Sequence, residues 1–346
     1  MVELKLTAIL LALSCGFGHA IWGEYQILAF IGQPSFPYLL MLDISTSDIW
    51  MYSDDCKNCP QSSRLNHNLT SPNNLDASFK LDFTTKDNDQ SGTIEGSLTT
   101  DYMLLVPDIH PIKDTKQHKI ALITKITGAD ETVDPYDSKL DGRIGLGLNK
   151  NSQTSTVDLL FGNYDKLLCL LQAQNGFVDT MLTLGQKMLD KEVKYTKITS
   201  ATVVDQNNGL WTVPLTSYTF GKYGATRNFK AQLSTTTSYI SVNPDLYEKV
   251  LDVLEAYEEN NNMLMDCSAK SQAPNLNLKI GGNTFTISPD TYIVDGPNAS
   301  ECIVKIRQVE DADDYFVLGT TFLDSFSFCL NYDTNTIDFL NVTGLK

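Results

Sequence analysis

Two hydroxyl-rich stretches of the sequence carry residue types from which a catalytic site could be built. The first, "LLMLDISTSDIW" at 39–50, is an apolar run that delivers Asp43 into a cluster of small hydroxylated residues. The second, "FKAQLSTTTSYIS" at 229–241, has the same texture, but Ser234 stands where the aspartate would be. Because a positioned carboxylate can act as a general acid or base, the question is whether Asp43 still has a partner.

The elements that must position these stretches are mainly β-strands. Short β-branched and aromatic runs recur between turn signals, as in "YQILAFIG", "FKLDFTT", "HKIALITKIT" and "YFVLGTTF", which is typical of a mainly β protein. An apolar strand, a hydroxyl-rich turn and a distant apolar-Gly pair occur twice, with Ile144-Gly145 in the first half and Leu318-Gly319 in the second. This weak repeat predicts two lobes of similar build, at 21–190 and 191–346, with the site between them.

Helices are expected to be few. The clearest spans Pro244–Glu258, with Asn243 as N-cap and Pro244 at its first position. A short second helix is expected at Val157–Phe161. Near the end of the chain, Asp333-Thr-Asn-Thr lies between two apolar strands and indicates a hairpin.

The composition limits the classes of partner. The chain has 346 residues, of which 42% are apolar, so it can bury a large core. Its 42 acidic and 26 basic residues give a formal charge of −16, which disfavours nucleic acid or an anionic membrane surface as a partner. A monomer is expected.

The first 20 residues, "MVELKLTAILLALSCGFGHA", are typical of a cleaved secretory signal. Lys5 precedes an apolar run, and Gly18 and Ala20 supply the small residues that a signal peptidase needs. No later stretch is long and apolar enough to cross a bilayer. A secreted, extracellular protein is therefore expected, and the sequons at Asn68, Asn298 and Asn341 fit surface glycosylation in that compartment.

Seven cysteines are present, and Cys15 leaves with the signal. An even set remains, which suits an oxidising compartment. Cys56 and Cys59 form a C-x-x-C in a Pro- and Ser-rich loop, where a tight structural disulfide is favoured over redox chemistry or half of a zinc site.

Metal and cofactor chemistry find little support in the sequence. The four histidines include no H-E-x-x-H, and "GLGLNK" at 145–150 lacks the spacing of a dinucleotide or phosphate loop. No metal and no cofactor are expected.

The order of these motifs resembles the pepsin-like aspartic peptidases over Tyr25 to Phe339. That family repeats an apolar strand running into Asp-Thr-Gly-Ser/Thr once per lobe. "MLDISTSDIW", the flap-like "DFTTKDNDQSGTIEGSLTTD", "DGRIGLGL" and the closing "YFVLGTTFLDSFSFCLNYDTNTIDF" match its segments in order. The resemblance implies two β-barrel-like lobes around an interlobe cleft, which is lined by Ser45, Thr46, Phe83, Thr235, Thr236 and Thr237. It also implies a Cys267–Cys302 disulfide and a Cys169–Cys329 disulfide that ties the lobes together, with two buried free thiols as the alternative to the latter.

The departures from the family pattern concern catalysis. In the family, one carboxylate acts as base on a shared water while its protonated partner donates to the scissile carbonyl. The first aspartate maps to Asp43, but the second maps to Ser234. The loop glycines correspond to Ser45 and Thr236, and the flap tyrosine to Phe83. Since a positioned acid or base contributes about 10²- to 10⁴-fold, losing the second carboxylate would remove most of the rate.

Three hypotheses follow. The leading one is an inactive pseudo-peptidase that binds a peptide, a protein or another ligand in its cleft. Family enzymes carry a basic propeptide, whereas here "EYQILAFIG" follows Ala20 almost at once, which favours a protein with no activity to suppress. The alternatives are an acid endopeptidase with Asp43 as its lone carboxylate, and a structural or storage glycoprotein.

Overall fold

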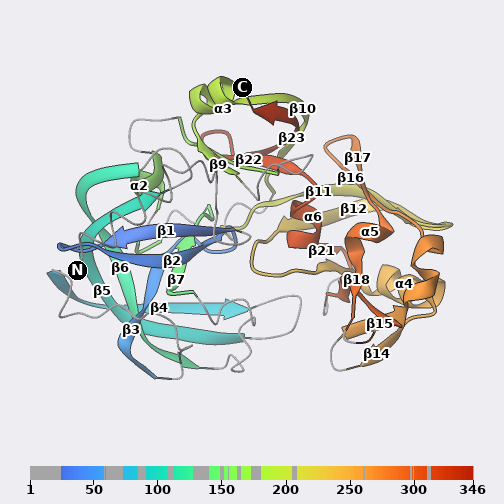
Figure 1. Ribbon diagram of the computed structural model, residues 1–346, viewed down its shortest axis with the longest axis horizontal. Coiled ribbons are helices and arrows are strands. Elements are labelled where there is room, and N and C mark those ends of the chain that lie inside the picture. The colour runs from blue at the N-terminus through green and yellow to red at the C-terminus, as the bar shows by residue number, and fades with distance from the viewer. Residues whose placement is uncertain are drawn as a thin grey trace.

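The computed structural model is a mainly β protein with two lobes, as expected (Figure 1). It describes residues 25–57, 59, 73–84, 91–106, 112–127, 140–148, 152–154, 156–161, 165–172, 181–204, 209–259, 262–296, 298, 300–309 and 313–345. The expected signal at 1–20, the sequon at Asn68 and the tip of the flap-like hairpin at 85–90 lie outside the described residues.

The N-terminal lobe is built on one sheet in the order β1-β2-β7-β3-β6-β5-β4. Its strands are β1 (Gln26–Ile31), β2 (Phe36–Asp43), β3 (Ile49–Lys57), β4 (Asn73–Thr84), β5 (Ser91–Val106), β6 (Ile112–Thr127) and β7 (Gly142–Gly145). Because β1 also pairs with β5, the sheet curls round into a barrel-like ring. The flap-like hairpin is formed by β4 and β5, which pair as far as Thr84 and Ser91.

The C-terminal lobe has a sheet in the order β17-β16-β11-β12-β21-β13-β20 and a smaller one in the order β14-β15-β19-β18. The strands of the first are β11 (Thr212–Phe220), β12 (Tyr223–Leu233), β13 (Ile240–Val242), β16 (Leu276–Ile280), β17 (Asn283–Ile287), β20 (Ile306–Gln308) and β21 (Tyr315–Leu318). Those of the second are β14 (Tyr257–Glu259), β15 (Asn262–Asp266), β18 (Ile293–Asp295) and β19 (Glu301–Val304). The two lobes lie side by side in Figure 1.

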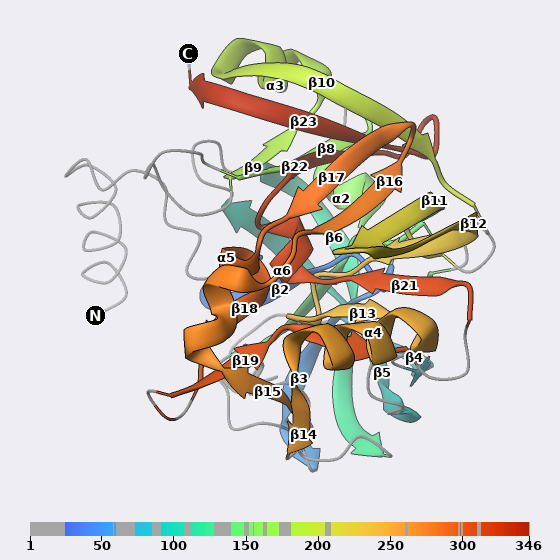
Figure 2. The ribbon, with the colours of Figure 1, turned by 90° about the vertical axis from the view of Figure 1, so that its right-hand side faces the viewer.

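A fourth sheet joins the two halves of the chain. It has the order β10-β23-β22-β8-β9, so β22 and β23 from the end of the chain lie between β10 on one side and β8 and β9 on the other. These strands are β8 (Leu167–Leu171), β9 (Met181–Leu184), β10 (Val193–Thr202), β22 (Ser327–Asn331) and β23 (Thr336–Leu345). In Figures 1 and 2, β10 and β23 run along the top of the molecule. The lobe boundary expected at 190/191 falls within α3 (Gln186–Glu192) and stays a prediction.

The three expected disulfides are present. Cys56–Cys59 and Cys267–Cys302 are local, whereas Cys169–Cys329 spans 160 residues. Cys169 of β8 and Cys329 of β22 are direct partners in the joining sheet, so this disulfide links the two halves of the chain, as the resemblance implied.

Two of the expected local elements are confirmed. The short helix is α2 (Val157–Phe161), and the expected hairpin turn lies between β22 and β23. Other short helical segments among the described residues are η3 (Cys267–Gln272), α5 (Pro289–Tyr292) and α6 (Thr320–Leu323).

The longer helix is shorter than expected, because α4 spans Pro244–Leu254 and not Pro244–Glu258. Its start is as expected, since Asn243 Oδ1 accepts a hydrogen bond from the Leu246 N–H at 3.2 Å. Glu255 then adopts a left-handed conformation, with φ 49° and ψ 37°, which ends the helix. Tyr257, which falls within the span expected for this helix, instead begins β14 and is 46% exposed.

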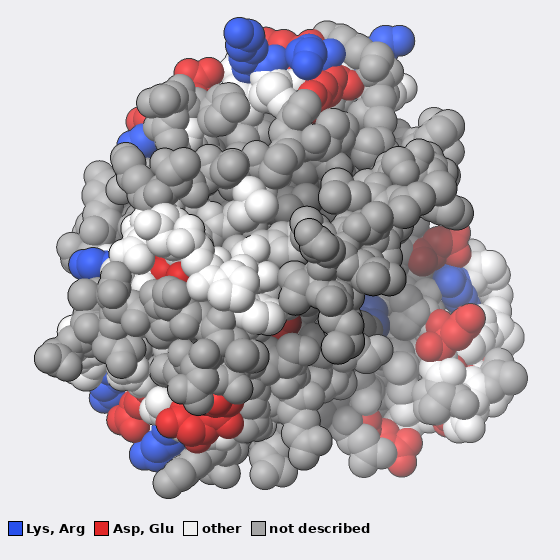
Figure 3. Space-filling model, turned by 60° about the vertical axis from the view of Figure 1, so that its left-hand side comes forward, with Lys and Arg blue, Asp and Glu red and all other residues white. Residues whose placement is uncertain are grey.

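A continuous apolar core runs through both lobes and the joining sheet, from Tyr25 to Phe339. No helix among the described residues is long and apolar enough to cross a membrane. On the face of the molecule shown in Figure 3, most of the described Lys and Arg side chains lie near Asp and Glu side chains.

Candidate active site

The two hydroxyl-rich loops begin at equivalent positions in the two lobes, each at the end of a strand. In the N-terminal lobe, β2 ends at Asp43, which pairs in parallel with Gly145 of β7. In the C-terminal lobe, β12 ends at Leu233, which pairs in parallel with Leu318 of β21, just before Gly319. A Cβ on Gly145 would lie 2.4 Å from Asp48 N, and one on Gly319 would lie 2.4 Å from Thr237 O. The apolar-Gly pairs therefore allow each loop to fold closely against its neighbouring strand.

The loops meet through one buried threonine. Thr235 Oγ1 donates to the Leu42 carbonyl at 2.6 Å and accepts from the Ile44 N–H at 3.2 Å. The reciprocal bond is lost, because Ile44 stands at the equivalent position of the first loop and has no hydroxyl. At this contact, only the second loop therefore contributes a threonine hydroxyl that bonds to the other loop.

Asp43 is fully buried and both of its carboxylate oxygens are engaged. Oδ1 accepts from the Ser45 N–H at 2.7 Å, and Oδ2 accepts from Thr46 Oγ1 at 3.1 Å. Arg143 Nη1 also donates to Oδ2 at 3.1 Å and forms an ion pair with it. Asp43 therefore binds two groups of its own loop as well as the guanidinium from β7.

Arg143 is the site residue that sequence reasoning missed. It lies in β7, in "DGRIGLGL", where the matching family segment reads Asp-Gly-Ile-Leu-Gly-Leu. Its side chain is only 15% exposed, and its guanidinium lies 5.4 Å from the centre of the Trp50 ring. The available signal was a cation inside an apolar strand, because a buried guanidinium needs an anion or a π-face nearby.

Ser234 belongs to a network of hydroxyls. Its Oγ lies 3.2 Å from Ser45 Oγ and 2.9 Å from Thr236 Oγ1, and it accepts from the Thr236 N–H at 3.3 Å. Its residue exposure is 3%. Ser45 and Ser234 thus form a second contact between the two loops beside that of Thr235, and the second loop offers hydroxyls and no carboxyl group at this contact.

The other expected cleft residues fall in two groups. Thr237 is buried, and its Oγ1 accepts from the Tyr239 N–H at 3.2 Å within the same loop. Phe83 pairs with Gly92 in the flap-like hairpin, but its side chain lies outside the described atoms. The loop residues therefore come together as expected, while the contribution of Phe83 stays a prediction.

A buried acid next to the first loop, Asp48, binds the segment 152–154. Asp48 Oδ1 accepts hydrogen bonds from Ser152 Oγ, the Gln153 N–H and the Thr154 N–H at 2.7, 2.9 and 3.1 Å. Asp48 is 6% exposed, and these charge-assisted bonds offset the cost of its burial. Within the described residues, no three His, Cys, Asp or Glu side chains are grouped so that they could hold a metal ion.

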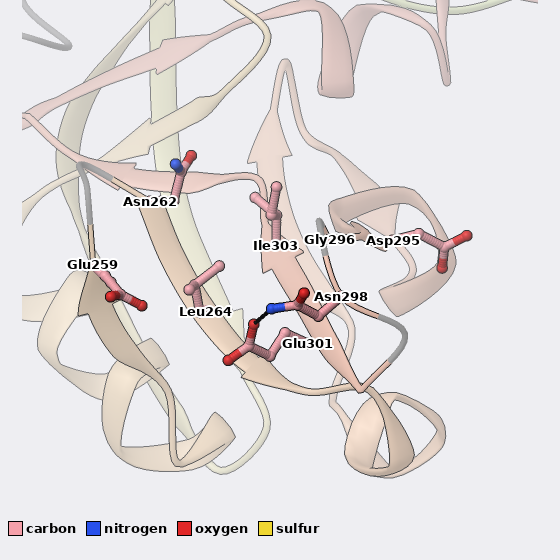
Figure 4. A pocket seen from close by; sticks show the side chains of 8 residues that line it. All are labelled: Glu259, Asn262, Leu264, Asp295, Gly296, Asn298, Glu301 and Ile303. Carbon is pink, nitrogen blue, oxygen red and sulfur yellow. Dashed lines mark hydrogen bonds between the residues drawn. The ribbon is translucent and has the colours of Figure 1, made fainter.

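A separate pocket of about 580 Å³ lies on the small sheet of the C-terminal lobe (Figure 4). It is lined by Glu259, Asn262, Leu264, Asp295, Gly296, Asn298, Glu301 and Ile303. Asn298, an expected glycosylation site, is exposed and donates to Glu301 Oε2 at 2.5 Å. Hydrogen bonds from Asn298 and Tyr257 lower the pKa of Glu301. Asn341, another expected glycosylation site, is exposed on β23.

Comparison with known proteins agrees with this architecture. The sequence model of the eukaryotic aspartyl proteases matches residues 24–342. A vacuolar aspartic protease of Candida albicans is 23% identical over 329 residues, covering 89% of this chain and 72% of that protein. Gastricsin of Cavia porcellus is 23% identical over 330 residues, covering 89% and 78%. Renin of Rattus norvegicus is 21% identical over 331 residues, covering 89% and 77%. The chain therefore belongs to the eukaryotic aspartyl protease family.

Proposed function

We propose that this chain is a secreted, catalytically inactive member of its family, which binds a peptide or another ligand between its lobes. The observation that carries the proposal is the environment of Asp43. This carboxylate is paired with the Arg143 guanidinium, and the side chain that the second loop brings to Ser45 is the Ser234 hydroxyl and not a second carboxyl group.

The chemistry of peptide hydrolysis by this family requires two carboxyl groups that share one proton. One carboxylate takes a proton from water, and the other donates its proton to the carbonyl. Ser234 is neutral and cannot share a carboxyl proton, while Arg143 cannot release a proton at any accessible pH. The pair Asp43–Arg143 is therefore a fixed ion pair and not an acid–base couple.

The ligand-binding part of the proposal is supported by what the chain keeps. The loops still meet through Thr235, and the hairpin of β4 and β5 is present. One similar protein is named a vacuolar aspartic protease, and proteases act on peptides. Loss of the chemistry alone leaves a site suited to hold a peptide without cutting it.

A peptidase assay tests the proposal. Purified protein is incubated with a library of quenched fluorescent peptides from pH 2 to pH 7, beside an Asp43→Ala variant. We expect no turnover above that of the variant. Turnover that depends on Asp43 would contradict the proposal and favour an endopeptidase with a lone carboxylate.

Two further variants test whether the site still fits a substrate. Ser234→Asp alone is expected to stay inactive, because Arg143 still occupies Oδ2 of Asp43. Ser234→Asp with Arg143→Ile supplies two carboxyls without the competing cation, and we expect turnover that Asp43→Ala abolishes. Secretion is checked separately by N-terminal sequencing of protein from a eukaryotic host, where cleavage after Ala20 is expected.

A further inference from the structure

Two cations share one aromatic ring in the C-terminal lobe. Arg307 Cζ lies 3.4 Å from the centre of the Tyr239 ring, and Lys305 Nζ lies 4.6 Å from it. All three side chains are partly or largely buried. The Tyr239 hydroxyl donates to Asn262 Oδ1 at 2.8 Å, which fixes the ring in place.

These cations have no acidic partner in the part of the chain that the structure describes. The ion pairs there involve Lys125, Arg143, Lys197 and Lys270. Arg307 Nε is buried and makes no hydrogen bond with a described group. Two like charges beside one buried ring repel each other, and a bound anion would relieve that repulsion.

The strand pairing of the sheet shows where Lys305 and Arg307 lie relative to the second hydroxyl-rich loop, which contains Ser234. Arg307 of β20 pairs with Ser241 of β13, Ser241 pairs with Val317 of β21, and Val317 pairs with Gln232 of β12. Directly paired residues point to the same side of a sheet. Leu233, which follows Gln232 in the chain, and Ile240, which precedes Ser241, both lie in the apolar core. The row that contains Gln232 and Ser241 therefore lies on the side of the sheet opposite the core.

Ser234 lies two residues after Gln232 in the chain. Neighbouring strands are about 4.8 Å apart, so the three steps from β12 to β20 place Arg307 about 14 Å along the row. An extended peptide rises about 3.3 Å per residue. A distance of 14 Å is therefore the span of about four extended residues.

We propose that Lys305 and Arg307 bind an acidic group of the ligand against Tyr239, about four extended residues from Gln232, in the strand that leads to Ser234. The chemistry is that of an oxyanion: a carboxylate of Glu or Asp, or a sulfate or phosphate ester. This inference rests on the proposed function, because it names the class of peptide that the site between the lobes would hold.

The residue types suit that class of ligand. The guanidinium is a planar fork that binds an oxyanion through two hydrogen bonds, whereas the ammonium acts as a compact point charge. Stacking on Tyr239 holds the guanidinium in one orientation before binding, which lowers the entropy that binding costs. The hydrogen bond to Asn262 keeps the ring itself in position.

The first experiment uses inorganic sulfate and needs no variant. Labelled protein is titrated with sodium sulfate at constant ionic strength, against sodium chloride, while the side-chain NMR signals of Arg307 Nε and Lys305 Nζ are followed. We expect saturable shifts at both residues. A matched control is Tyr223, which also has two cations beside its ring, from Lys222 and Lys249, but donates to Asp252 Oδ2 at 3.3 Å.

Equal sulfate shifts at Lys222 and Lys249, or none at Arg307, would overturn the proposal. The variants Lys305→Ala and Arg307→Ala are each expected to weaken sulfate binding about tenfold, since a charge-assisted hydrogen bond contributes about that factor. Lys249→Ala is expected to leave sulfate binding unchanged.

The second experiment uses two peptide libraries that differ only in Glu or Gln at each position. We expect the Glu library to bind more tightly, and Arg307→Ala to remove the difference. If both libraries bind equally and Arg307→Ala changes neither, the anion site is overturned while the proposed function stands. If sulfate binds at Arg307 but neither library binds, the anion site stands and peptide binding fails.

Discussion

Arg143 Nη1 lies 3.1 Å from Oδ2 of Asp43, so this buried carboxylate is held in an ion pair within its own lobe. The two residues are 100 positions apart in the chain. They meet because β7 pairs with both β2 and β3, which places Arg143 beside the end of β2.

Removing the guanidinium should destabilise the fold. Arg143→Met leaves Asp43 fully buried without its countercharge, and we expect the free energy of unfolding to fall by about 3 kcal/mol. Urea denaturation at pH 7 measures this loss. The double variant Arg143→Met with Asp43→Asn removes both charges and should lose less than Arg143→Met alone. Strictly additive losses would show that the two charges are not coupled.

The contact between the loops should depend on the hydroxyl of Thr235. Thr235→Val keeps the shape but leaves the Leu42 carbonyl and the Ile44 N–H without this buried partner, so we expect a loss of about 2–4 kcal/mol. Thr286→Val on the exposed face of β17 is the control, with an expected change of less than about 0.5 kcal/mol. The two variants are compared by denaturant midpoint, and similar midpoints would refute a role for the Thr235 hydroxyl in joining the lobes.

The disulfide of the joining sheet should contribute more stability than the local one in the C-terminal lobe. In the chain-entropy account, closing 160 residues between Cys169 and Cys329 contributes about 5 kcal/mol, and closing 35 residues between Cys267 and Cys302 about 4 kcal/mol. Paired Cys→Ser variants, Cys169 with Cys329 and Cys267 with Cys302, are compared by chemical denaturation. A larger loss from the second pair would contradict this ranking.

Alkaline pH should unfold the protein through its buried tyrosines. Burial, with the charges of Asp141 and Asp101 adding to it, raises the pKa of Tyr38 to about 12 from its ordinary 10.0. Burial also raises the pKa of Tyr332. A raised folded-state pKa means that the stability is fully present below pH 10 and declines between pH 10 and pH 12, by about 1.4 kcal/mol per pH unit for each such group.

This pH dependence is measured by absorbance at 295 nm together with tryptophan fluorescence. We expect part of the phenolate signal to rise only when the fluorescence reports unfolding. Tyr38→Phe should move the alkaline midpoint to higher pH. An unchanged midpoint would show that Tyr38 does not resist ionisation in the folded state.

Local patterns predicted much of the architecture. The N-cap at Asn243, the short helix at Val157–Phe161 and the hairpin before Thr336 depend on interactions between near neighbours, so the sequence reveals them. The end of α4 could not be found this way. Tyr257 continues the apolar pattern of a helix, but pairing of Tyr257 with Leu264 in the small sheet outweighs that preference.

The sequence by itself showed that Ser234 stands in the second loop where Asp43 stands in the first, because the two loops repeat one pattern. Only the tertiary structure decided what takes up the charge of Asp43. Arg143 reaches it through parallel strand pairing across 100 residues, and no spacing rule along the chain encodes that contact. The same holds for Lys305, Arg307 and Tyr239, which the pairing of β13 with β20 brings to one place.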